Sequence, residues 1–394
     1  MNSLWPKRLL EDLVDPQRPI TYGVVKPGDE QPPEGVRLIR GGDVLNGRIN
    51  RELRTIAPDV SDQYRRTLLR GGELVMSLVG NPGAVAVVPP DLAGSNLARQ
   101  VGLIALQPFA EARYVMYSLM APDGKNALTA RTKGSVQQVI NLADLRRVPI
   151  SLPPLSTQRR IASILGAYDD LIEVNRRRIA VLEEMARRLF EEWFVHFRFP
   201  GCGAGLTDGE LPSGWSLVPL EQMLVLQRGF DLPSAARGAG AHPVIAASGV
   251  HGTHSEFRVR GPGVVTGRSG TLGTVNLVHQ DFWPLNTTLY VREFRRASPA
   301  YALHLLRHLK LGAHGGGAAV PTLNRNHVHA LKVPCAPPEL IAQFEQHAMT
   351  TLVTAYNLER QNSRLAESRD LLLPRLISGD RTVTTAEREL EPVA

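Results

Sequence analysis

The chain has 394 residues, of which 43% are hydrophobic and 21% charged, and its formal net charge is +7. These values are typical of a globular protein with two or three domains. Cys202 and Cys335, the two cysteines, lie far apart, which excludes a disulfide framework and a cysteine-based zinc site. No apolar run is long enough to cross a membrane, and the N-terminus lacks a secretory pattern, so we expect no membrane contact and a cytoplasmic location.

The basic side chains are concentrated in two segments of the chain. Residues 1–153 carry 19 basic and 15 acidic residues, and residues 201–336 carry 12 and 7. Residues 154–200 carry 8 basic and 7 acidic residues, and residues 337–394 carry 6 and 9. Chance is one explanation of this distribution, and the binding of a polyanion by the two basic segments is the other.

The predicted elements occur in the same order twice along the chain. In each half, short alternating apolar runs rich in Gly and Val predict strands, and a Pro-Pro pair then precedes a long helix. The first helix is expected from about Ser156 to about Phe197, and the second from about Glu339 to about Ser378, with Gly379 as its C-cap. The expected organisation is an α/β domain at 1–152, a helix region at 153–198, a linker at 199–214, a second α/β domain at 215–336, a helix region at 337–380 and a disordered tail at 381–394.

Matching motifs indicate an internal duplication. The motif "WPKRLLED" matches "WSLVPLEQ", and "LRGGELVMSLVGNPGAVAVV" matches "VRGPGVVTGRSGTLGTVNLV", with Asn96 then placed on Asn286. The motif "INLADLRRVPISLPP" matches "LNRNHVHALKVPCAPP", with Asn141 placed on Asn324. The offset between the copies falls from 210 to 183, so the first copy is longer by about 27 residues, which we expect in loops.

Both long helices carry an apolar seam with a period of 3.5 residues, which is typical of a coiled coil. The alternative is that each helix packs separately on its own domain. Apolar residues beside the seam, namely Ile164, Leu171, Met185, Phe190 and Phe194, are expected to be exposed and available to a partner. The seam residues are Ile161, Leu165, Tyr168, Ile172, Asn175, Ile179, Leu182 and Leu189 in the first helix, and Phe344, Leu358, Asn362, Leu365 and Leu372 in the second.

Each seam contains one asparagine. If the helices run antiparallel and their seams are centred on each other, paired residue numbers sum to about 537, and Asn175 faces Asn362. A buried amide is costly unless it is hydrogen-bonded, so this pair would favour one register over all others. We therefore expect the two side chains to lie about 3 Å apart. The alternative is a solvated Asn175 near the helix edge.

This arrangement resembles the specificity (S) subunits of type I restriction-modification systems, over roughly residues 1–380. The resemblance rests on the order of "VQQVINLADLRRVPISLPPLSTQRRIASIL" and "VPTLNRNHVHALKVPCAPPELIAQF". It also rests on "RGFDLP", "GRSGTLGTV", "FWPLNTTLY" and "SRDLLLPRLISGD". One departure is Val136-Gln137, where the family often has the proline that stands here only at Pro321, so we expect the first loop to differ in shape.

The resemblance implies an α+β fold with a pseudo-two-fold internal duplication and no catalytic site. Each α/β domain would be a target-recognition domain that reads one half of a bipartite, asymmetric site in double-stranded DNA. The helices would form an antiparallel coiled coil, set the half-site spacing and dock two methyltransferase (M) subunits, and restriction (R) subunits would complete the complex. S-adenosylmethionine, ATP and Mg are then expected only on the partner subunits, with no cofactor on this chain.

The glycine-rich "GRSGTLG" at residues 267–273 is interpreted as a tight turn between strands, because no Lys-Ser/Thr pair of a phosphate-binding loop follows it. Such a turn would also let Arg268 approach DNA, where a guanidinium can bind guanine O6 and N7 together. The candidate DNA-contact residues are Arg268, Ser269, Arg131, Lys133, Arg228, His314 and Arg325.

Sequence patterns for metal binding and catalysis are weak. The histidine pairs "HGTH" and "NHVH" lack the i, i+4 spacing of a helical zinc site, so we expect no metal. We find no Asn/Asp-Pro-Pro-aromatic motif of an adenine methyltransferase, no cofactor fingerprint, no acidic nuclease cluster and no serine triad. Two hypotheses stay open: a non-catalytic recognition subunit, of a restriction or a methylation-only system, and an enzyme with an unrecognised nuclease or methyltransferase site. Binding of S-adenosylmethionine or ATP by the chain alone would distinguish them.

Overall fold

The computed structural model describes residues 5–134, 138–201, 210–315 and 321–384. Much of the predicted linker, most of the predicted tail, and Val136-Gln137 lie outside the described residues. In the described parts of the chain, no helix has the length and apolar character that crossing a membrane requires.

The chain packs as two compact units. Unit 1 comprises Met1–Glu173 and Asn362–Ala394, and unit 2 comprises Val174–Gln361. Each unit therefore contains part of both long helices, whereas the sequence suggested a separate region for each helix. Every contact between a long helix and an α/β domain that is described below therefore lies within a single unit.

The two long helices are α5 (Leu155–Phe190) and α8 (Pro338–Ser378). Both begin within one residue of the predicted position. Helix α5 passes at its C-terminal end into a π-helical turn, Glu191–Val195, so the regular helix is shorter than predicted. Helix α8 ends where predicted, and Gly379 has a φ of 85°, the left-handed conformation of a glycine C-cap.

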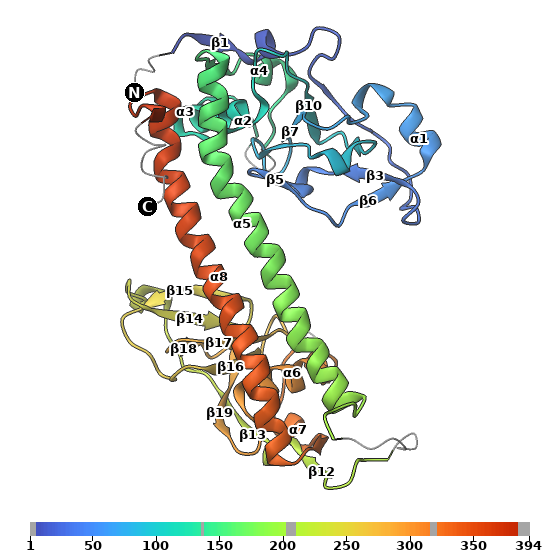
Figure 1. Ribbon diagram of the computed structural model, residues 1–394, viewed down its shortest axis with the longest axis vertical. Coiled ribbons are helices and arrows are strands. Elements are labelled where there is room, and N and C mark those ends of the chain that lie inside the picture. The colour runs from blue at the N-terminus through green and yellow to red at the C-terminus, as the bar shows by residue number, and fades with distance from the viewer. Residues whose placement is uncertain (1–4, 135–137, 202–209, 316–320, 385–394) are drawn as a thin grey trace. The chain divides into compact units, whose positions relative to one another are not determined.

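Unit 1 is built from three sheets, a hairpin and short helices (Figure 1). The four-stranded sheet has the order β2-β10-β7-β8, the three-stranded sheet β6-β3-β9, and β1 pairs with β11. Helix α2 packs against β8, α3 and β11. The strands are β1 (Lys7–Leu9), β2 (Thr21–Tyr22), β3 (Val36–Ile39), β4 (Val44–Leu45), β5 (Arg48–Ile49), β6 (Arg54–Ile56), β7 (Leu74–Ser77), β8 (Val85–Val87), β9 (Asn96–Leu97), β10 (Val101–Ile104) and β11 (Pro149–Ser151), and the helices are α1 (Pro58–Asp62), α2 (Ala112–Met120), α3 (Pro122–Thr129) and α4 (Leu142–Arg146).

Unit 2 has sheets of the same kind and order. The four-stranded sheet is β13-β19-β16-β17, the three-stranded sheet is β15-β14-β18, and β12 pairs with β20. In each three-stranded sheet the central strand has one antiparallel and one parallel neighbour. The elements are β12 (Ser216–Pro219), β13 (Leu224–Arg228), β14 (His242–Ala246), β15 (Gly249–His254), β16 (Gly263–Gly267), β17 (Val275–Val278), β18 (Trp283–Pro284), β19 (Thr288–Phe294), α6 (Pro299–His308), the 3₁₀ helix η8 (Leu311–His314), α7 (Arg325–Ala330) and β20 (Lys332–Cys335).

Equivalent hydrogen bonds occur at equivalent positions in the two units. Asn141 and Asn324 each cap a short helix, α4 and α7, by accepting a backbone N–H with the side-chain oxygen. The matched backbone pairs, donor first, are Leu10–Val148 with Leu220–Leu331, Leu78–Gln100 with Arg268–Thr287, and Ile140–Leu78 with Leu323–Arg268. The residues of these pairs have the offsets that the sequence motifs predicted, except Gln100 and Thr287, which lie 187 residues apart.

The predicted match of Asn96 with Asn286 is wrong. The Leu97 carbonyl in unit 1 and the Pro284 carbonyl in unit 2 accept equivalent backbone hydrogen bonds, which sets the offset here at 187 rather than 190. Arg99 therefore corresponds to Asn286. Asn96 is fully buried and bonded inside unit 1, so the shared asparagine was a coincidence of sequence.

The extra length of the first copy includes a hairpin. In unit 2, β14 and β15 are joined by the two residues Ala247 and Ser248. In unit 1, the equivalent strands β3 and β6 are joined by residues 40–53, which carry a 3₁₀ turn and the β4–β5 hairpin. This hairpin packs against β8, the edge strand of the four-stranded sheet.

Candidate nucleic-acid interface

Within unit 1, α5 and α8 lie side by side and run antiparallel. The Arg369 guanidinium of α8 pairs with the Asp169 carboxylate of α5. One turn further along α5, the Ile172 carbonyl accepts a 3.4 Å hydrogen bond from the Asn362 amide. Residue numbers rise in one helix as they fall in the other, which defines the antiparallel direction.

The same direction holds within unit 2. The Asn175 amide donates to Gln361 Oε1 at 3.0 Å, and the Trp193 and Phe344 rings pack with centroids 6.3 Å apart. These pairs agree with the predicted register to within one residue. All the predicted seam residues in the two helices are buried or half-buried.

Asn175 is fully buried, so the alternative of a solvated position is wrong. Its side chain bonds Gln361, the residue before the predicted partner. The predicted contact between Asn175 and Asn362 would join the two units and stays a prediction.

The prediction that the flanks of the seam are exposed is only partly correct. Leu171 and Met185 are 40% and 56% exposed. Ile164, Phe190 and Phe194 are buried, because they belong to the cores of their own units. Periodicity identified the apolar face of the helix but not whether a domain of the same chain covers it.

Polar side chains join the helices to the α/β domain in unit 1. Asp169 accepts a 2.5 Å hydrogen bond from the Tyr117 hydroxyl and also pairs with Arg369. Burial and the Asp169 charge raise the pKa of Tyr117 above its usual value, so the phenol stays protonated and donates. The Arg113 guanidinium binds both Asp170 oxygens, at 3.0 and 2.9 Å.

An aromatic cluster makes the corresponding junction in unit 2. Phe190, which ends α5, and Phe194, in the π-helical turn that follows, pack on Tyr301 of α6 and on Phe344 of α8, with ring centroids 4.8 to 5.9 Å apart. His304 is buried among these rings, and burial lowers its pKa to about 3. The ring is therefore neutral at physiological pH.

The glycine-rich loop at residues 268–273 is held by two neighbouring segments of unit 2. The N–H groups of Arg268 and Ser269 both donate to the Thr287 carbonyl, at 2.9 and 3.1 Å. The Arg268 carbonyl accepts from the Leu323 N–H at 2.8 Å. Chain segments far apart in sequence thus meet at one end of the four-stranded sheet.

Several polar candidates gather beside this loop. The Arg268 guanidinium is 3.5 Å from the Asn286 carbonyl oxygen, and the Asn286 amide donates to Asp231. Arg228, which ends β13, is exposed and lies three residues before Asp231. Guanidinium, amide and carboxylate groups are the side chains that read base edges in DNA.

His314 and Arg325 border the same loop. A Cβ atom built on Gly273 would lie 3.0 Å from the Gly312 nitrogen, so the loop packs directly on η8, which ends at His314. Arg325 opens α7 next to the capping residue Asn324, and both His314 and Arg325 are exposed. The structure thus brings together the five candidates of unit 2.

The two candidates of unit 1 are already engaged by their neighbours. The Arg131 guanidinium donates to the carbonyls of Ala127 and Arg147, at 2.8 and 3.1 Å. The Lys133 ammonium lies 3.1 Å from Asp144 and holds the pKa of that carboxyl below its usual value. The Lys133 side chain is 72% exposed, so it is the better placed of the two to meet a phosphate.

The sequence reasoning missed Tyr22, Arg99 and Asp231. Built Cβ atoms at Gly23 and Gly229 would lie 1.8 and 2.3 Å from backbone oxygens, so both positions require glycine and correspond to each other. Tyr22, which is exposed, therefore occupies the place of Arg228. The signal was the shared glycine of "TYGVV" and "QRGFD", which the motif comparison did not use.

The histidines of unit 2 have neighbours within the fold. His329 Nε2 accepts a 2.9 Å hydrogen bond from the Leu226 N–H, and the His251 ring bonds the Ser248 hydroxyl at 2.8 Å. Among the described residues, no three His, Cys, Asp or Glu side chains are placed to hold a metal ion.

Comparison with known proteins gives one family. Residues 25–184 match the family model "Type I restriction modification DNA specificity domain". The EcoBI specificity subunit of Escherichia coli is 30% identical over 174 residues, which are 43% of this chain and 36% of that subunit. The MjaIX specificity subunit of Methanocaldococcus jannaschii is 23% identical over 299 residues, 68% of this chain and 69% of that subunit.

The chain is a relative of type I specificity subunits. The family resemblance inferred from the motifs is thus confirmed. The chain aligns with little more than a third of the EcoBI subunit, at 36% of its length. The fold extends the likeness to such a specificity subunit: the type I S subunit from M. genitalium superposes with a TM-score of 0.60 at 17% identity, covering 95% of this chain and 96% of that one.

Proposed function

We propose that this chain is the non-catalytic DNA-recognition subunit of a type I restriction-modification complex, with one recognition domain in each unit. The observation that carries the proposal is the repeated construction of the two units. In both, a glycine-containing loop after a central strand lies beside an asparagine-capped short helix, within a basic segment of the chain. Two similar but non-identical surfaces suit a bipartite, asymmetric site.

In this proposal an internal duplication relates the units by a pseudo-two-fold axis, and the long helices form an antiparallel coiled coil. The seam from Ile161 to Trp193 rises about 50 Å at about 1.5 Å per residue, and this length sets the spacing of the half-sites. Helix α5 also exposes apolar side chains at Val174, Val181 and Met185. Their spacing of seven and four residues puts them on one face, which suits docking of a methyltransferase subunit.

The remaining parts of the proposal concern partners and cofactors. Two methyltransferase subunits bind one copy of this chain, and restriction subunits join the complex. The methyltransferases supply the S-adenosylmethionine site, and the restriction subunits supply the ATP and Mg sites. The complex acts on cytoplasmic DNA.

The proposal is tested by expressing this chain with the methyltransferase subunit of its host and sequencing the methylome. We expect adenine methylation at a bipartite motif, and a longer spacer in that motif when one heptad is inserted into each long helix. Methylation without R-dependent cleavage would identify a methylation-only system. Methylation or cleavage of DNA by this chain alone, or a motif with no spacer, would contradict the proposal.

Arg268 offers a test of the recognition surface itself. Replacing Arg268 with Ala should weaken specific binding by about 1–3 kcal/mol and relax one position of one half-site. Replacing Lys133 with Ala should instead weaken binding to all sequences alike and reduce its salt dependence. An unchanged motif in the Arg268→Ala variant would mean that Arg268 only supports the turn.

A further inference from the structure

Arg99 in unit 1 and Asn286 in unit 2 occupy equivalent places, two residues after the short buried strands β9 and β18. Matching backbone contacts hold the chain just before each of them. These contacts, unit 1 first, are the hydrogen bonds from the Ala98 N–H to the Ile39 carbonyl at 2.9 Å and from the Leu285 N–H to the Ile245 carbonyl at 2.8 Å, and the parallel bridges Val24–Ala98 and Phe230–Leu285. The backbone is thus held alike at both places, although the side chains differ.

Both places lie beside the glycine-containing loop of their own unit. In unit 1 the Gln100 carbonyl, next to Arg99, accepts a 2.7 Å hydrogen bond from the Leu78 N–H, just before the loop. In unit 2 the Thr287 carbonyl, next to Asn286, accepts hydrogen bonds from the first two residues of the loop, at 2.9 and 3.1 Å. Arg99 and Asn286 therefore belong to the proposed recognition surfaces.

The Arg99 side chain is exposed. Among the described residues, no hydrogen bond or ion pair involves its guanidinium. The Arg99 backbone N–H donates to the Val24 carbonyl at 2.8 Å, and the next residue, Val25, stands where unit 2 has Asp231 and is 39% exposed. No carboxylate occupies that place in unit 1, so the guanidinium keeps its five N–H donors for a ligand.

The Asn286 side chain is half-buried and donates a hydrogen bond to Asp231. Because a carboxylate can only accept hydrogen bonds, the amide nitrogen of Asn286, and not its oxygen, faces Asp231. In the part of the chain that the structure describes, the side-chain oxygen and the second N–H of Asn286 have no further partner. Asp231 therefore orients the amide so that one acceptor and one donor are left side by side.

We propose that Arg99 selects a G·C base pair in one half-site and that Asn286, oriented by Asp231, selects an A·T base pair at the equivalent place of the other half-site. The inference rests on the proposed function and names the bases that the same surfaces read. In the major groove the Arg99 guanidinium donates to guanine O6 and N7. The Asn286 oxygen accepts from adenine N6, and its second N–H donates to adenine N7. Asp231 is a positioning residue, because it acts on the base only through Asn286.

The difference between the two places favours base reading over phosphate binding. Phosphate contacts fix the position of a protein on DNA and carry no sequence information. Arg99 can neutralise a phosphate, whereas the Asn286 amide is neutral and bonded to a carboxylate. A phosphate contact common to both units would need a similar charge at both places. Similar backbones with different donor and acceptor patterns suit the reading of two half-sites of different sequence.

The test is the DNA motif that the full chain directs when it is expressed with the methyltransferase subunit of its host. Methylome sequencing gives the motif, and methylation rates of duplexes with one altered base pair give the discrimination at each position. Arg99→Ala should lower the discrimination at one G·C pair by about tenfold. Asn286→Ala should do the same at one A·T pair of the opposite half-site, which is the half-site that Arg268→Ala relaxes.

Two further variants separate base reading from charge and from folding. Arg99→Gln should lose the preference for G·C and favour A·T at the same position, because a side-chain amide matches adenine N6 and N7. Asp231→Ala should relax the same A·T pair as Asn286→Ala, because the amide is then free to rotate. Asp231→Glu, which keeps an acceptor, should retain part of the preference. Relaxation of a different pair by Asp231→Ala overturns the positioning role.

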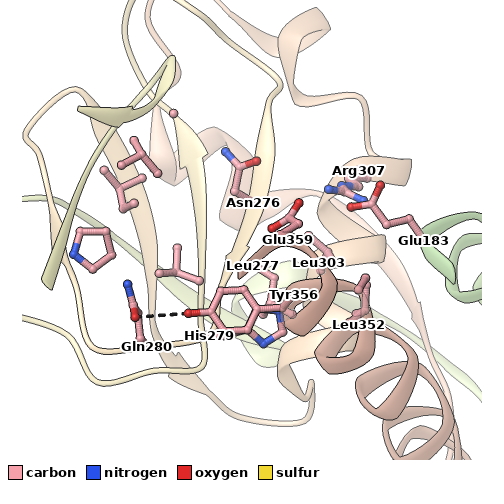
Figure 2. Close-up of a pocket in the computed structure, with 16 residues that line it drawn as sticks. Glu183, Asn276, Leu277, His279, Gln280, Leu303, Arg307, Leu352, Tyr356 and Glu359 are labelled. Carbon is pink, nitrogen blue, oxygen red and sulfur yellow. Dashed lines mark hydrogen bonds between the residues drawn. The ribbon is translucent and has the colours of Figure 1, made fainter. Parts of the chain in front are cut away.

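Two matched controls, Asn276→Ala and Arg8→Ala, should leave the motif unchanged. Asn276 is half-buried in unit 2 like Asn286, but it lies on β17 and lines a cavity of about 320 Å³ (Figure 2). In unit 1 the strand equivalent to β17 is β8, against which the β4–β5 hairpin packs. Arg8 is an exposed arginine of unit 1 on β1, which pairs with β11 and not with the sheet that carries the loop.

The inference is overturned if Arg99→Ala and Arg99→Gln both keep the original motif, or if Asn286→Ala keeps it. Relaxation of an A·T pair by Arg99→Ala, or action of Arg99 and Asn286 on the same half-site, also overturns it. If the unaltered chain directs methylation at a bipartite motif that these variants do not change, only this inference fails. If the unaltered chain directs no methylation, the proposed function fails with it.

Discussion

The two units join the same pair of helices to similar α/β domains through different chemistry. In unit 1 the junction is a network of charges and a phenol centred on Asp169 and Arg369. In unit 2 the equivalent positions, at an offset of 183, are Leu352 and Ala186, and both are buried in an aromatic core. The backbone arrangement therefore does not depend on one set of side chains, and each junction responds to different conditions.

The comparison has a physical consequence for stability. A charged network weakens when salt screens it or when one partner is removed, and its geometry must be kept for its energy to be gained. An aromatic core depends on filled volume and is insensitive to salt. Unit 1 should therefore respond to ionic strength and unit 2 to cavities and to the protonation of buried groups.

The largest effect is expected from a cavity in unit 2. Phe344 is fully buried between the rings of α5 and α6, so Phe344→Ala should destabilise unit 2 by about 3–5 kcal/mol at any salt concentration. Hydrogen exchange of unit 2 amides measures this loss. Phe344→Leu, which keeps most of the volume, should lose much less. A loss below about 1 kcal/mol for the alanine variant would mean that the rings repack freely.

The next largest effect should break the polar junction of unit 1. Asp169→Asn removes the less exposed of the two carboxylates that pair with Arg369, because the Asp169 side chain is 22% exposed and that of Asp370 is 61% exposed. We expect the free energy of unfolding of unit 1 to fall by about 2 kcal/mol, and by less at high salt concentration. The control is Asp170→Asn, because Asp170 is 61% exposed and its pair with Arg113 should contribute under about 1 kcal/mol.

A pH dependence should distinguish unit 2. His304 is neutral in the folded protein, with a pKa lowered to about 3, whereas in the unfolded chain it titrates near 6.5. The contribution of the neutral ring to the free energy of unfolding is complete above pH 6.5. It is lost as the pH falls toward 3, because the unfolded state binds the proton more readily. At pH 5 the loss is about 2 kcal/mol.

His304→Phe should remove this component of the pH dependence of unfolding. His308→Phe is the control, because His308 is exposed on the same helix and should not change the slope. Equal slopes between pH 7 and pH 5 for the His304 variant and the unaltered chain would show that the ring accepts a proton in the folded state.

The smallest effect is expected at the polar contact between Asn175 and Gln361 in the unit 2 helix pair. Asn175→Ala removes the hydrogen bond to Gln361 and should cost about 1 kcal/mol. Chemical denaturation measures the change, and Gln361→Ala in the Asn175→Ala background should add little. Fully additive losses would show that the two side chains do not depend on each other.

Local sequence signals were sufficient for much of this fold. The ends of α8 followed from the proline pair and Gly379, and the seams followed from a repeat of 3.5 residues, because both depend on neighbours along the chain. The motif offsets matched hydrogen bonds such as Leu10–Val148 and Leu220–Leu331 for the same reason. The gathering of Arg228, Arg268 and Arg325 was not visible in the sequence, because it arises where distant segments meet.

The tertiary structure alone decided which apolar faces are covered and which are left open. Phe190 and Phe194 are apolar at the right spacing for a partner, but α6 of the same unit covers them. The place that the β4–β5 hairpin fills in unit 1 is a cavity in unit 2, because the connection between β14 and β15 is too short to reach it. Periodicity along one helix reports that a side chain avoids water, whereas the identity of what excludes the water depends on contacts far away in the chain.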